Sequence, residues 1–278
     1  FNYHYSNRGY HPLLCYDGLT GDLLKAVLRP GNVYSSTDCC EFLQPLLMEY
    51  LEDYPDIKLY LRGDSGFAKP ELFEQLESNG TSYAIRLKEN ATLKAMAESL
   101  DKELDELTAD NKVDYAVVYG EFQYAASSWG YPRRIAVKVE KPSGQLVYMH
   151  TFIVTNMDLK PEDIIRFYCN RGRMENFIKE SKNGFDMDTM SSHSMTVNEN
   201  RMQLSVLAYN LFNWFRRLVL PESMRKFQVD TIRLKLLKIA TKMVRSARYI
   251  TFKLCSSCPY KREFYETLKN IQLIPKLE

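Results

Sequence analysis

The sequence predicts a mixed α/β fold that is interrupted by a β-rich block and followed by a helical C-terminal region. Short apolar runs alternate with amphipathic stretches over the first 107 residues, which is the pattern of a mixed sheet flanked by helices. Successive strand-like segments then replace this alternation, and helical periodicity returns at Pro161. Of the 278 residues, 45% are hydrophobic and 26% are charged, which is an ordinary globular balance.

The first part of the predicted core covers residues 1–107. Residues 10–17 predict a buried strand, and residues 23–29 predict its hairpin partner across a turn marked by Gly18 and Gly21. Further along we expect a helix capped by Asp38 and reaching about Glu52, a strand at 57–61, a helix at 70–78, a strand at 82–87 and a helix over about 90–107.

The β-rich block covers residues 108–158. Its predicted strands lie at 113–119, 134–139 and 146–154, with a turn at Gly130 between the first two. Because an all-β block stands inside an otherwise α/β chain, we interpret it as an insertion into the core.

The second part of the predicted core covers residues 159–220, and residues 221–278 form the predicted helical C-terminal region. The basic run from Arg233 to Arg245 is either a surface that follows DNA or a solvated helix face. A long helix over 202–218 carries an apolar stripe that we expect in the core: Leu204, Leu207, Leu211, Phe212, Trp214 and Phe215.

Composition excludes several classes of protein. No apolar run is long enough to cross a bilayer, so we expect no membrane association. The formal net charge is only +2, so a basic surface that binds nucleic acid must be local.

The six cysteines are irregularly spaced, and the lone pair Cys255 and Cys258 favours free thiols over a zinc site. With no signal peptide visible, a cytoplasmic location is predicted.

Four polar residues mark the helix that begins near Pro161. Successive steps of three, four and seven residues place them within an arc of about 60° on a helix. On spacing alone, this stripe is either a solvated face with an Arg171–Glu175 ion pair or a functional edge. The four residues are Tyr168, Arg171, Glu175 and Lys182.

The stripe in full resembles the YREK signature of bacterial insertion-sequence DDE transposases. A second piece agrees, because Leu61–Phe67 at a strand end resembles the family segment that bears the second catalytic Asp, here Asp64. The aromatic opening and the segment from Ala26 to Gly31 also resemble the family, and the resemblance extends to about Leu220. It implies an RNase H-like core interrupted by a β-rich insertion just before the helix with Glu175.

The resemblance also implies a site. Asp64 and Glu175 would be catalytic ligands of two Mg²⁺ ions, for which Mn²⁺ is expected to substitute, since such hard cations prefer carboxylate oxygens. Tyr168, Arg171 and Lys182 would hold DNA phosphates.

The family's first catalytic Asp lies on a strand that precedes the segment matching Phe1. The chain is therefore expected to be N-terminally truncated and inactive alone. Asp17 and Asp22 are weaker candidates for the third acid, because the family pattern places no ligand there.

Other candidate residues lie outside the signature. Trp129 stands beside Arg133 and Arg134 at a predicted β tip, where it either stacks on an extruded DNA base or packs against the protein. His193 is either a solvated loop residue or a DNA contact. The tripeptide Arg62–Asp64 also matches a cell-adhesion motif, which the absence of a visible secretion signal disfavours.

The resemblance implies a DNA transposase that cleaves transposon ends and transfers the strands into target DNA. Its expected partners are terminal inverted-repeat DNA, target DNA and a second copy of the chain, in the bacterial cytoplasm at the nucleoid. Two alternatives stay open: an RNase H-like nuclease without strand transfer, and a non-catalytic DNA-binding protein derived from a transposase.

Overall fold

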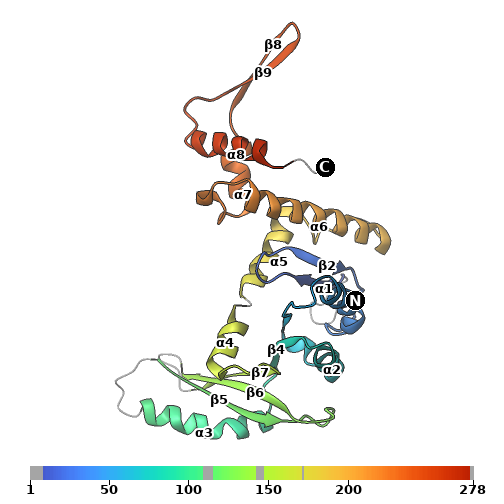
Figure 1. Cartoon of the computed structure of the whole chain (residues 1–278), viewed down its shortest axis with the longest axis vertical. Coiled ribbons are helices and arrows are strands. Elements are labelled where there is room, and N and C mark those ends of the chain that lie inside the picture. The colour runs from blue at the N-terminus through green and yellow to red at the C-terminus, as the bar shows by residue number, and fades with distance from the viewer. Residues whose placement is uncertain (1–8, 109–114, 142–146, 171, 276–278) are drawn as a thin grey trace. The chain divides into compact units, whose positions relative to one another are not determined.

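The computed structural model describes residues 9–108, 115–141, 147–170 and 172–275 (Figure 1). A mixed sheet flanked by helices confirms the predicted α/β fold class and fits an RNase H-like architecture. The chain divides into two compact units. Unit 1 comprises residues 1–13 and 29–172, and unit 2 comprises residues 14–28 and 173–278.

Unit 1 is built on a five-stranded sheet with the order β3-β4-β7-β6-β5. β3 runs parallel to β4, whereas the β4–β7, β7–β6 and β6–β5 pairs are antiparallel. The strands are β3 (Tyr60–Gly63), β4 (Ser82–Leu87), β5 (Ala116–Tyr124), β6 (Arg133–Lys141) and β7 (Met149–Thr155).

The predicted β-rich block is not a separate layer, because β7 pairs with β4 and extends the same sheet. The register places Ala84 opposite Thr155 and Ile85 opposite Val154. Tyr83, Ala84 and Ile85 of β4 are all fully buried, as is typical of a central strand, and β4 lies between β3 and β7. The three strands are therefore inserted in sequence but continuous with the core sheet in space.

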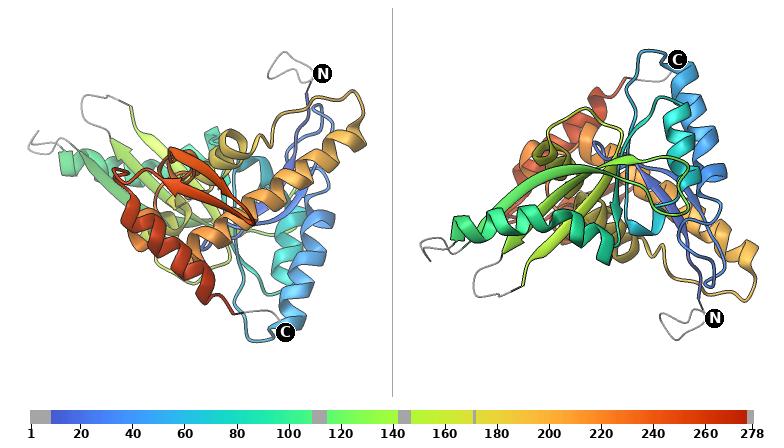
Figure 2. Two further views of the ribbon diagram at one scale, coloured as in Figure 1. Left: turned by 90° about the horizontal axis from the view of Figure 1, so that it is seen from above. Right: turned by 90° about the horizontal axis from the view of Figure 1, so that it is seen from below.

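Helices of unit 1 cover this sheet. α4 (Pro161–Cys169) packs Ile164, Ile165 and Tyr168 against Ala84, Ala136 and Ile153 of the strands. α3 (Ala91–Thr108) lies along β5 and β6 (Figure 2). It approaches so closely that a Cβ on Gly120 would lie 2.7 Å from Leu100.

α1 and α2 lie side by side in unit 1 (Figure 2). α1 covers Cys39–Asp53 and α2 covers Pro70–Ser78; the first was predicted from helical spacing and the second from the proline in its first turn. Leu72, Phe73 and Leu76 of α2 are fully buried, and each contributes about 1.5–3 kcal/mol by leaving water. The predicted cap at Asp38 is wrong in its detail: this residue adopts a left-handed conformation, and its side chain makes no capping hydrogen bond.

In unit 2, two helices hold the hairpin of β1 (Leu13–Tyr16) and β2 (Leu23–Val27). The Asn210 amide accepts from the Leu23 N–H at 2.8 Å and donates to the Leu23 carbonyl at 3.0 Å, as a neighbouring strand would. Gly21 has φ +79, and a Cβ there would lie 2.8 Å from Phe177. The turn therefore needs glycine. The helices are α5 (Gly172–Phe185) and α6 (Met195–Leu218).

The apolar stripe of α6 is not the core face that the sequence predicts. Leu204, Leu207 and Leu211 are 67%, 56% and 52% exposed, and Trp214 is 49% exposed. Phe212 and Phe215 are only partly buried. They pack against a small cluster of buried residues, which are Leu220, Met224, Ile232 and Leu236. The fully covered face instead carries Met202, Tyr209, Asn198 and Asn213.

Hydrogen bonding explains this reversal. Tyr209 and Asn213 both donate to the carbonyl of Gly21, at 2.8 and 3.0 Å, so their polar atoms are satisfied inside the unit. Hydrophobic periodicity cannot detect a face that is buried through such bonds.

The predicted helical C-terminal region also contains a β-hairpin. The basic run beginning at Arg233 is helical only to Leu237 and then enters a strand. The elements are a short 3₁₀ turn (Glu222–Met224), α7 (Val229–Ile232), a π-helical turn (Arg233–Leu237), β8 (Thr241–Ser246), β9 (Tyr249–Leu254) and α8 (Lys261–Leu273). Within the described residues, no helix combines the length and apolar character that crossing a membrane requires.

Candidate active site

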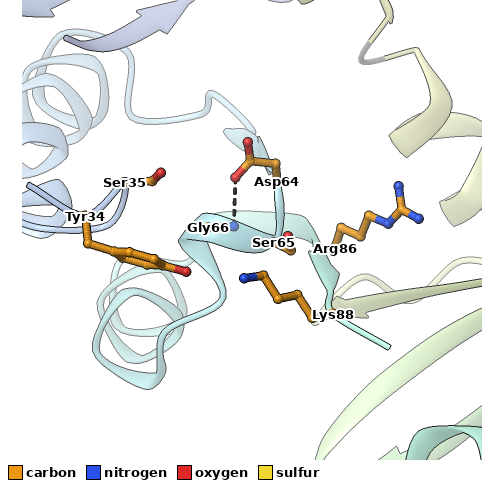
Figure 3. A pocket seen from close by; sticks show the side chains of 7 residues that line it. All are labelled: Tyr34, Ser35, Asp64, Ser65, Gly66, Arg86 and Lys88. Atoms are coloured by element: carbon orange, nitrogen blue, oxygen red, sulfur yellow. Dashed lines mark hydrogen bonds between the residues drawn. The ribbon is translucent and has the colours of Figure 1, made fainter. Parts of the chain in front are cut away.

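Asp64 stands directly after β3, where it begins a single 3₁₀ turn over Ser65–Phe67. Its carboxylate atom Oδ1 accepts the backbone N–H of Gly66 at 2.8 Å (Figure 3). The backbone N–H of Phe67 donates to the Asp64 carbonyl at 3.0 Å, which closes the turn. The carboxylate is therefore oriented by its own backbone at the end of a sheet strand.

Gly66 is needed for this geometry because nothing larger fits beside the carboxylate. A Cβ on Gly66 would lie 2.9 Å from Oδ1 of Asp64 and 2.9 Å from Cβ of Ser35. Gly66 is thus a steric requirement of the site.

An open cavity of about 390 Å³ lies beside Asp64 within unit 1. Figure 3 shows side chains from three places in the chain around it: the loop before α1, the turn after β3, and the end of β4. Carboxylate, hydroxyl and cationic groups dominate this lining, so the cavity is suited to a charged ligand. The lining residues are Tyr34, Ser35, Asp64, Ser65, Gly66, Arg86 and Lys88.

Arg86 and Lys88 supply the positive charge of this cavity. β3 and β4 are parallel with Gly63 opposite Ile85, so Asp64 and Arg86 follow at the same edge of the sheet. Both cations are exposed, whereas Leu87 between them is buried. In the described part of the chain, no carboxylate and no hydrogen-bond acceptor engages either side chain. They are therefore available to an anionic ligand.

Arg62 has a structural role two residues before Asp64. Its guanidinium donates to the carbonyl of Phe167 at 3.0 Å and lies 5.1 Å from the centre of the same residue's ring. These contacts tie the end of β3 to the last turn of α4. Because Arg62 is engaged inside the unit, the cell-adhesion interpretation gains no support.

The single helix predicted from Pro161 through Lys182 is wrong. α4 ends at Cys169, and α5 begins at Gly172. Asn170 and Gly172 are poor helix formers, which favours an interruption between the two helices. The four-residue stripe is consequently divided between two helices, and Arg171 lies outside the described residues.

Tyr168 is the member of the stripe on α4. Its side chain is 5% exposed and packs in the core of unit 1 with Ala84 and Ala136. This placement favours a packing role for the ring, and DNA contact by Tyr168 stays a prediction.

Glu175 and Lys182 both lie on α5 of unit 2, and both are exposed. A separation of seven residues is close to two helical turns, so the two side chains share one face. Glu175 stands in the first turn, where the helix dipole favours a negative charge. Two of the four residues of the predicted stripe therefore lie on one face of α5.

Buried contacts within unit 2 fix α5. The Tyr16 and Ser181 hydroxyls lie 2.9 Å apart in a buried hydrogen bond that joins β1 to the helix. Glu180 pairs with Arg216 of α6 and also accepts the backbone N–H of Val229 at 2.9 Å. These contacts fix the helix that presents Glu175.

Asp64 and Glu175 belong to different compact units, so their meeting around a metal stays a prediction. Among the described residues, no group of three or more His, Cys, Asp or Glu side chains could hold a metal ion. The donor chemistry at Asp64 nevertheless fits a hard cation, because a carboxylate and the Ser35 and Ser65 hydroxyls lie around one polar cavity.

Trp129 and Arg133 form a packed cluster at the end of the β5–β6 hairpin. Arg133 is only 3% exposed, and its guanidinium donates to both carboxylate oxygens of Glu77, at 2.8 and 3.0 Å. It lies 5.6 Å from the Trp129 ring centre and 4.2 Å from that of Tyr131. This favours the packing alternative for both residues, and their DNA contacts stay predictions.

Arg134 is also held by the protein. It donates to the carbonyls of Met157 and Leu159, at 2.5 and 2.7 Å, and pairs with Glu121. These contacts favour a structural role for its guanidinium, and DNA contact by Arg134 stays a prediction.

The weaker candidates have local partners or exposed positions. Asp17 accepts from the Leu19 N–H and the Thr20 hydroxyl at 2.8 and 2.6 Å, which is the bonding of a turn. Asp22 receives two hydrogen bonds from Arg217, both at 2.7 Å. His193 is an exposed residue before α6.

The CxxC pair lies after β9. Cys255 and Cys258 are both free cysteines, and the Cys255 sulfur lies 3.1 Å from the Ser257 hydroxyl. The structure therefore gives the pair no metal-binding partners among the described residues.

Sequence reasoning missed Tyr34, Ser35, Arg86 and Lys88. A signal for the two cations was present, because the predicted strands at 57–61 and 82–87 alternate with helices as parallel neighbours do. The carboxyl ends of parallel strands meet at one edge, where ligands bind. No comparable signal marks Tyr34 and Ser35, which reach the cavity from a loop.

Comparison with protein families identifies a match over nearly the whole chain. A family model described as "Transposase DDE domain group 1" matches residues 1–276. No curated protein matches the chain.

Proposed function

The chain belongs to the transposase DDE domain family, and from this premise we propose that it is the catalytic domain of a bacterial insertion-sequence transposase. The proposed reaction is metal-dependent cleavage of transposon ends followed by strand transfer into target DNA. The observation that carries the proposal is the cavity beside Asp64, where a fixed carboxylate and the cations Arg86 and Lys88 stand at one sheet edge.

Two Mg²⁺ ions are the proposed cofactors, and Mn²⁺ is expected to substitute for them. Asp64 and Glu175 would hold them, since both supply carboxylate oxygens and Glu175 is exposed at the start of α5. Such ions, when bound, activate the attacking hydroxyl and stabilise the leaving oxygen.

The other side chains would bind and orient the DNA. Arg86 can grip a backbone phosphate through two parallel hydrogen bonds, and Lys88 adds a point charge. Lys182, on the same face of α5 as Glu175, would contact a phosphate beside the scissile bond. The family signature assigns DNA contacts to Tyr168 and Arg171 as well, and these stay predictions.

The proposed partners are the terminal inverted repeats, target DNA and a second copy of the chain on paired ends. These partners, like a location at the bacterial nucleoid, rest on the family rather than on a contact within the chain. The experiments below use the complete gene product.

The test is nicking of a supercoiled plasmid that carries the terminal repeats. We expect nicking by the complete gene product only with Mg²⁺ or Mn²⁺. Asp64→Asn and Glu175→Gln should each abolish it while leaving DNA binding largely intact. Matched controls are Asp56→Asn in unit 1 and Glu266→Gln in unit 2, which neutralise exposed carboxylates outside the site. Normal cutting by either site variant would overturn the assignment.

The same assay separates the two alternatives. Pre-cleaved transposon ends supplied with target DNA report strand transfer directly. Nicking without transfer would indicate an RNase H-like nuclease. Binding of the terminal repeats with no nicking under any metal would indicate a non-catalytic DNA-binding protein derived from a transposase.

A further inference from the structure

The hairpin of β8 and β9 in unit 2 has no role in the proposed catalytic site. Its two strands pair over Thr241–Leu254 through a turn at Ala247 and Arg248 (Figure 1). Several large hydrophobic side chains of the hairpin are exposed to solvent: Met243 is 63% exposed, Tyr249 is 74% exposed and Phe252 is 65% exposed. A two-stranded hairpin without a packed face is marginally stable in water, so this one is suited to folding against a partner.

The hairpin is the centre of a strongly basic segment. From Thr231 to Arg262 the sequence has nine lysines and arginines and no acidic residue, although the whole chain has a net charge of only +2. Within the described residues, no carboxylate pairs with the four cations of the hairpin. They are Lys242, Arg245, Arg248 and Lys253.

The strand register adds a second observation that points to an anion. Lys242 lies directly opposite Lys253, and Ser246 lies opposite Tyr249. Side chains of directly opposed residues share a face, and like charges in that position destabilise a sheet. An anionic ligand along this face would relieve the repulsion.

We propose that the β8–β9 hairpin is a DNA-binding ribbon, an inference that rests on DNA being the substrate of the proposed function. A two-stranded ribbon fits the major groove of B-form DNA. Lys242 and Lys253 on one face, with Arg245 on the other and Arg248 at the turn, would contact the phosphates that border the groove. Tyr249 next to the turn would pack against the groove wall.

The test measures how DNA binding depends on salt. The complete gene product is titrated into a fluorescein-labelled 30-bp duplex of arbitrary sequence, because phosphate contacts carry no sequence information. Anisotropy gives the binding constant at several KCl concentrations. The variant replaces the four hairpin cations by serine: Lys242→Ser, Arg245→Ser, Arg248→Ser and Lys253→Ser.

We expect this variant to bind tenfold or more weakly at 0.1 M KCl. The slope of log K against log salt is negative, and each lost phosphate contact should reduce its magnitude by about 0.9. We therefore predict a slope that is shallower by about 2 or more. The maximal nicking rate at saturating protein should stay unchanged, because the hairpin does not belong to the catalytic site.

A matched variant controls for net charge. Lys226→Ser, Lys261→Ser, Arg262→Ser and Lys269→Ser remove four exposed cations elsewhere in unit 2. The control should keep most of the wild-type slope. Thermal unfolding of both variants checks that neither has lost its fold.

Three outcomes are distinguishable. If the wild-type protein does not bind the duplex, the proposed function itself fails. If the wild-type protein binds and the hairpin variant keeps its slope, the ribbon inference is overturned. If the hairpin variant instead changes the sedimentation coefficient without changing the slope, the hairpin is an interface between copies, which also overturns the inference.

Discussion

The backbone N–H of Gly66 donates to Oδ1 of Asp64 across 2.8 Å, and the carboxylate is thereby fixed by the turn that follows β3. A Cβ at Gly66 would approach the same oxygen to 2.9 Å. The position of the Asp64 carboxylate therefore depends on Gly66 in two ways: the backbone N–H of Gly66 holds it, and a side chain at that position would crowd it.

Gly66→Ala should therefore displace the carboxylate or Ser35 by several tenths of an ångström. A misplacement of this order lowers catalysis strongly, and we expect Mg²⁺-dependent nicking to fall about tenfold or more. Gly130→Ala is the control, because nothing lies within 4 Å of a Cβ there. Equal nicking by the two variants would contradict the role given to Gly66.

Arg86→Ala combined with Lys88→Ala should weaken DNA binding and slow nicking. Loss of two phosphate contacts should make the negative slope of log K against log salt shallower by about 1.8. The control combines Lys58→Ala and Lys160→Ala, which removes the same charge from exposed positions in unit 1. An unchanged slope in the Arg86 and Lys88 variant would show that these cations do not touch DNA.

Much of the fold follows from the sequence where the local pattern and the packing agree. The helix at 70–78 and the strand at 82–87 match their predicted bounds, because Pro70 starts the helix and the centre of the strand is buried from Tyr83 to Ile85. The helix predicted from Pro161 ends at Cys169. Asn170 and Gly172 are poor helix formers and indicate a break, but the regular spacing of the four-residue stripe favoured one continuous helix. Spacing alone does not show whether a helix is continuous.

Burial on α6 could not be predicted from hydrophobicity. The sequence shows an apolar stripe at Leu204, Leu207 and Leu211, yet the covered face includes Asn213, whose amide is satisfied by the Gly21 carbonyl. Such a pairing joins residues 192 positions apart. Only the folded chain reveals it.

The candidate site was predicted in part. Asp64 and Glu175 were found through the family resemblance, and their positions at a strand end and in a first helical turn suit ligands. The environment of Asp64 was not predicted, because Tyr34 and Ser35 reach the cavity from a loop without regular spacing.

Glu77→Ala should destabilise unit 1 by about 3–5 kcal/mol. The Arg133 side chain is only 2% exposed, and removal of its carboxylate partner leaves a buried charge without compensation. Chemical denaturation measures the free energy of unfolding. Glu162→Ala, which breaks an exposed pair with Arg166, is the control and should cost far less. A cost no larger than that of the control would contradict the structural role of the Arg133 cluster.

The same carboxylate predicts a pH dependence of stability. Burial alone would raise the pKa of Glu77, but hydrogen bonds from Arg133, Tyr131 and Tyr83 outweigh it and hold the pKa below its ordinary value of 4.5. The folded state therefore binds fewer protons than the unfolded state at acid pH. This contribution to stability is complete above pH 4.5 and is lost as the pH falls through the lowered pKa.

Glu77→Gln removes the titrating group while keeping the shape of the side chain. Urea denaturation between pH 7 and pH 3 should show a shallower acid loss of stability in this variant than in the wild type. Parallel pH profiles for the two proteins would contradict the assignment.

The central claim is that Asp64 and Glu175 hold the same metal site. Fe²⁺ can replace Mg²⁺ in the complete gene product. With ascorbate and peroxide it produces hydroxyl radicals, which cut the polypeptide backbone near the bound metal. We predict breaks around residue 64 and around residue 175 of the same molecules, and Asp64→Asn should remove both sets. Breaks around only one of the two acids, or an Asp64→Asn variant that keeps those near Glu175, would contradict the claim.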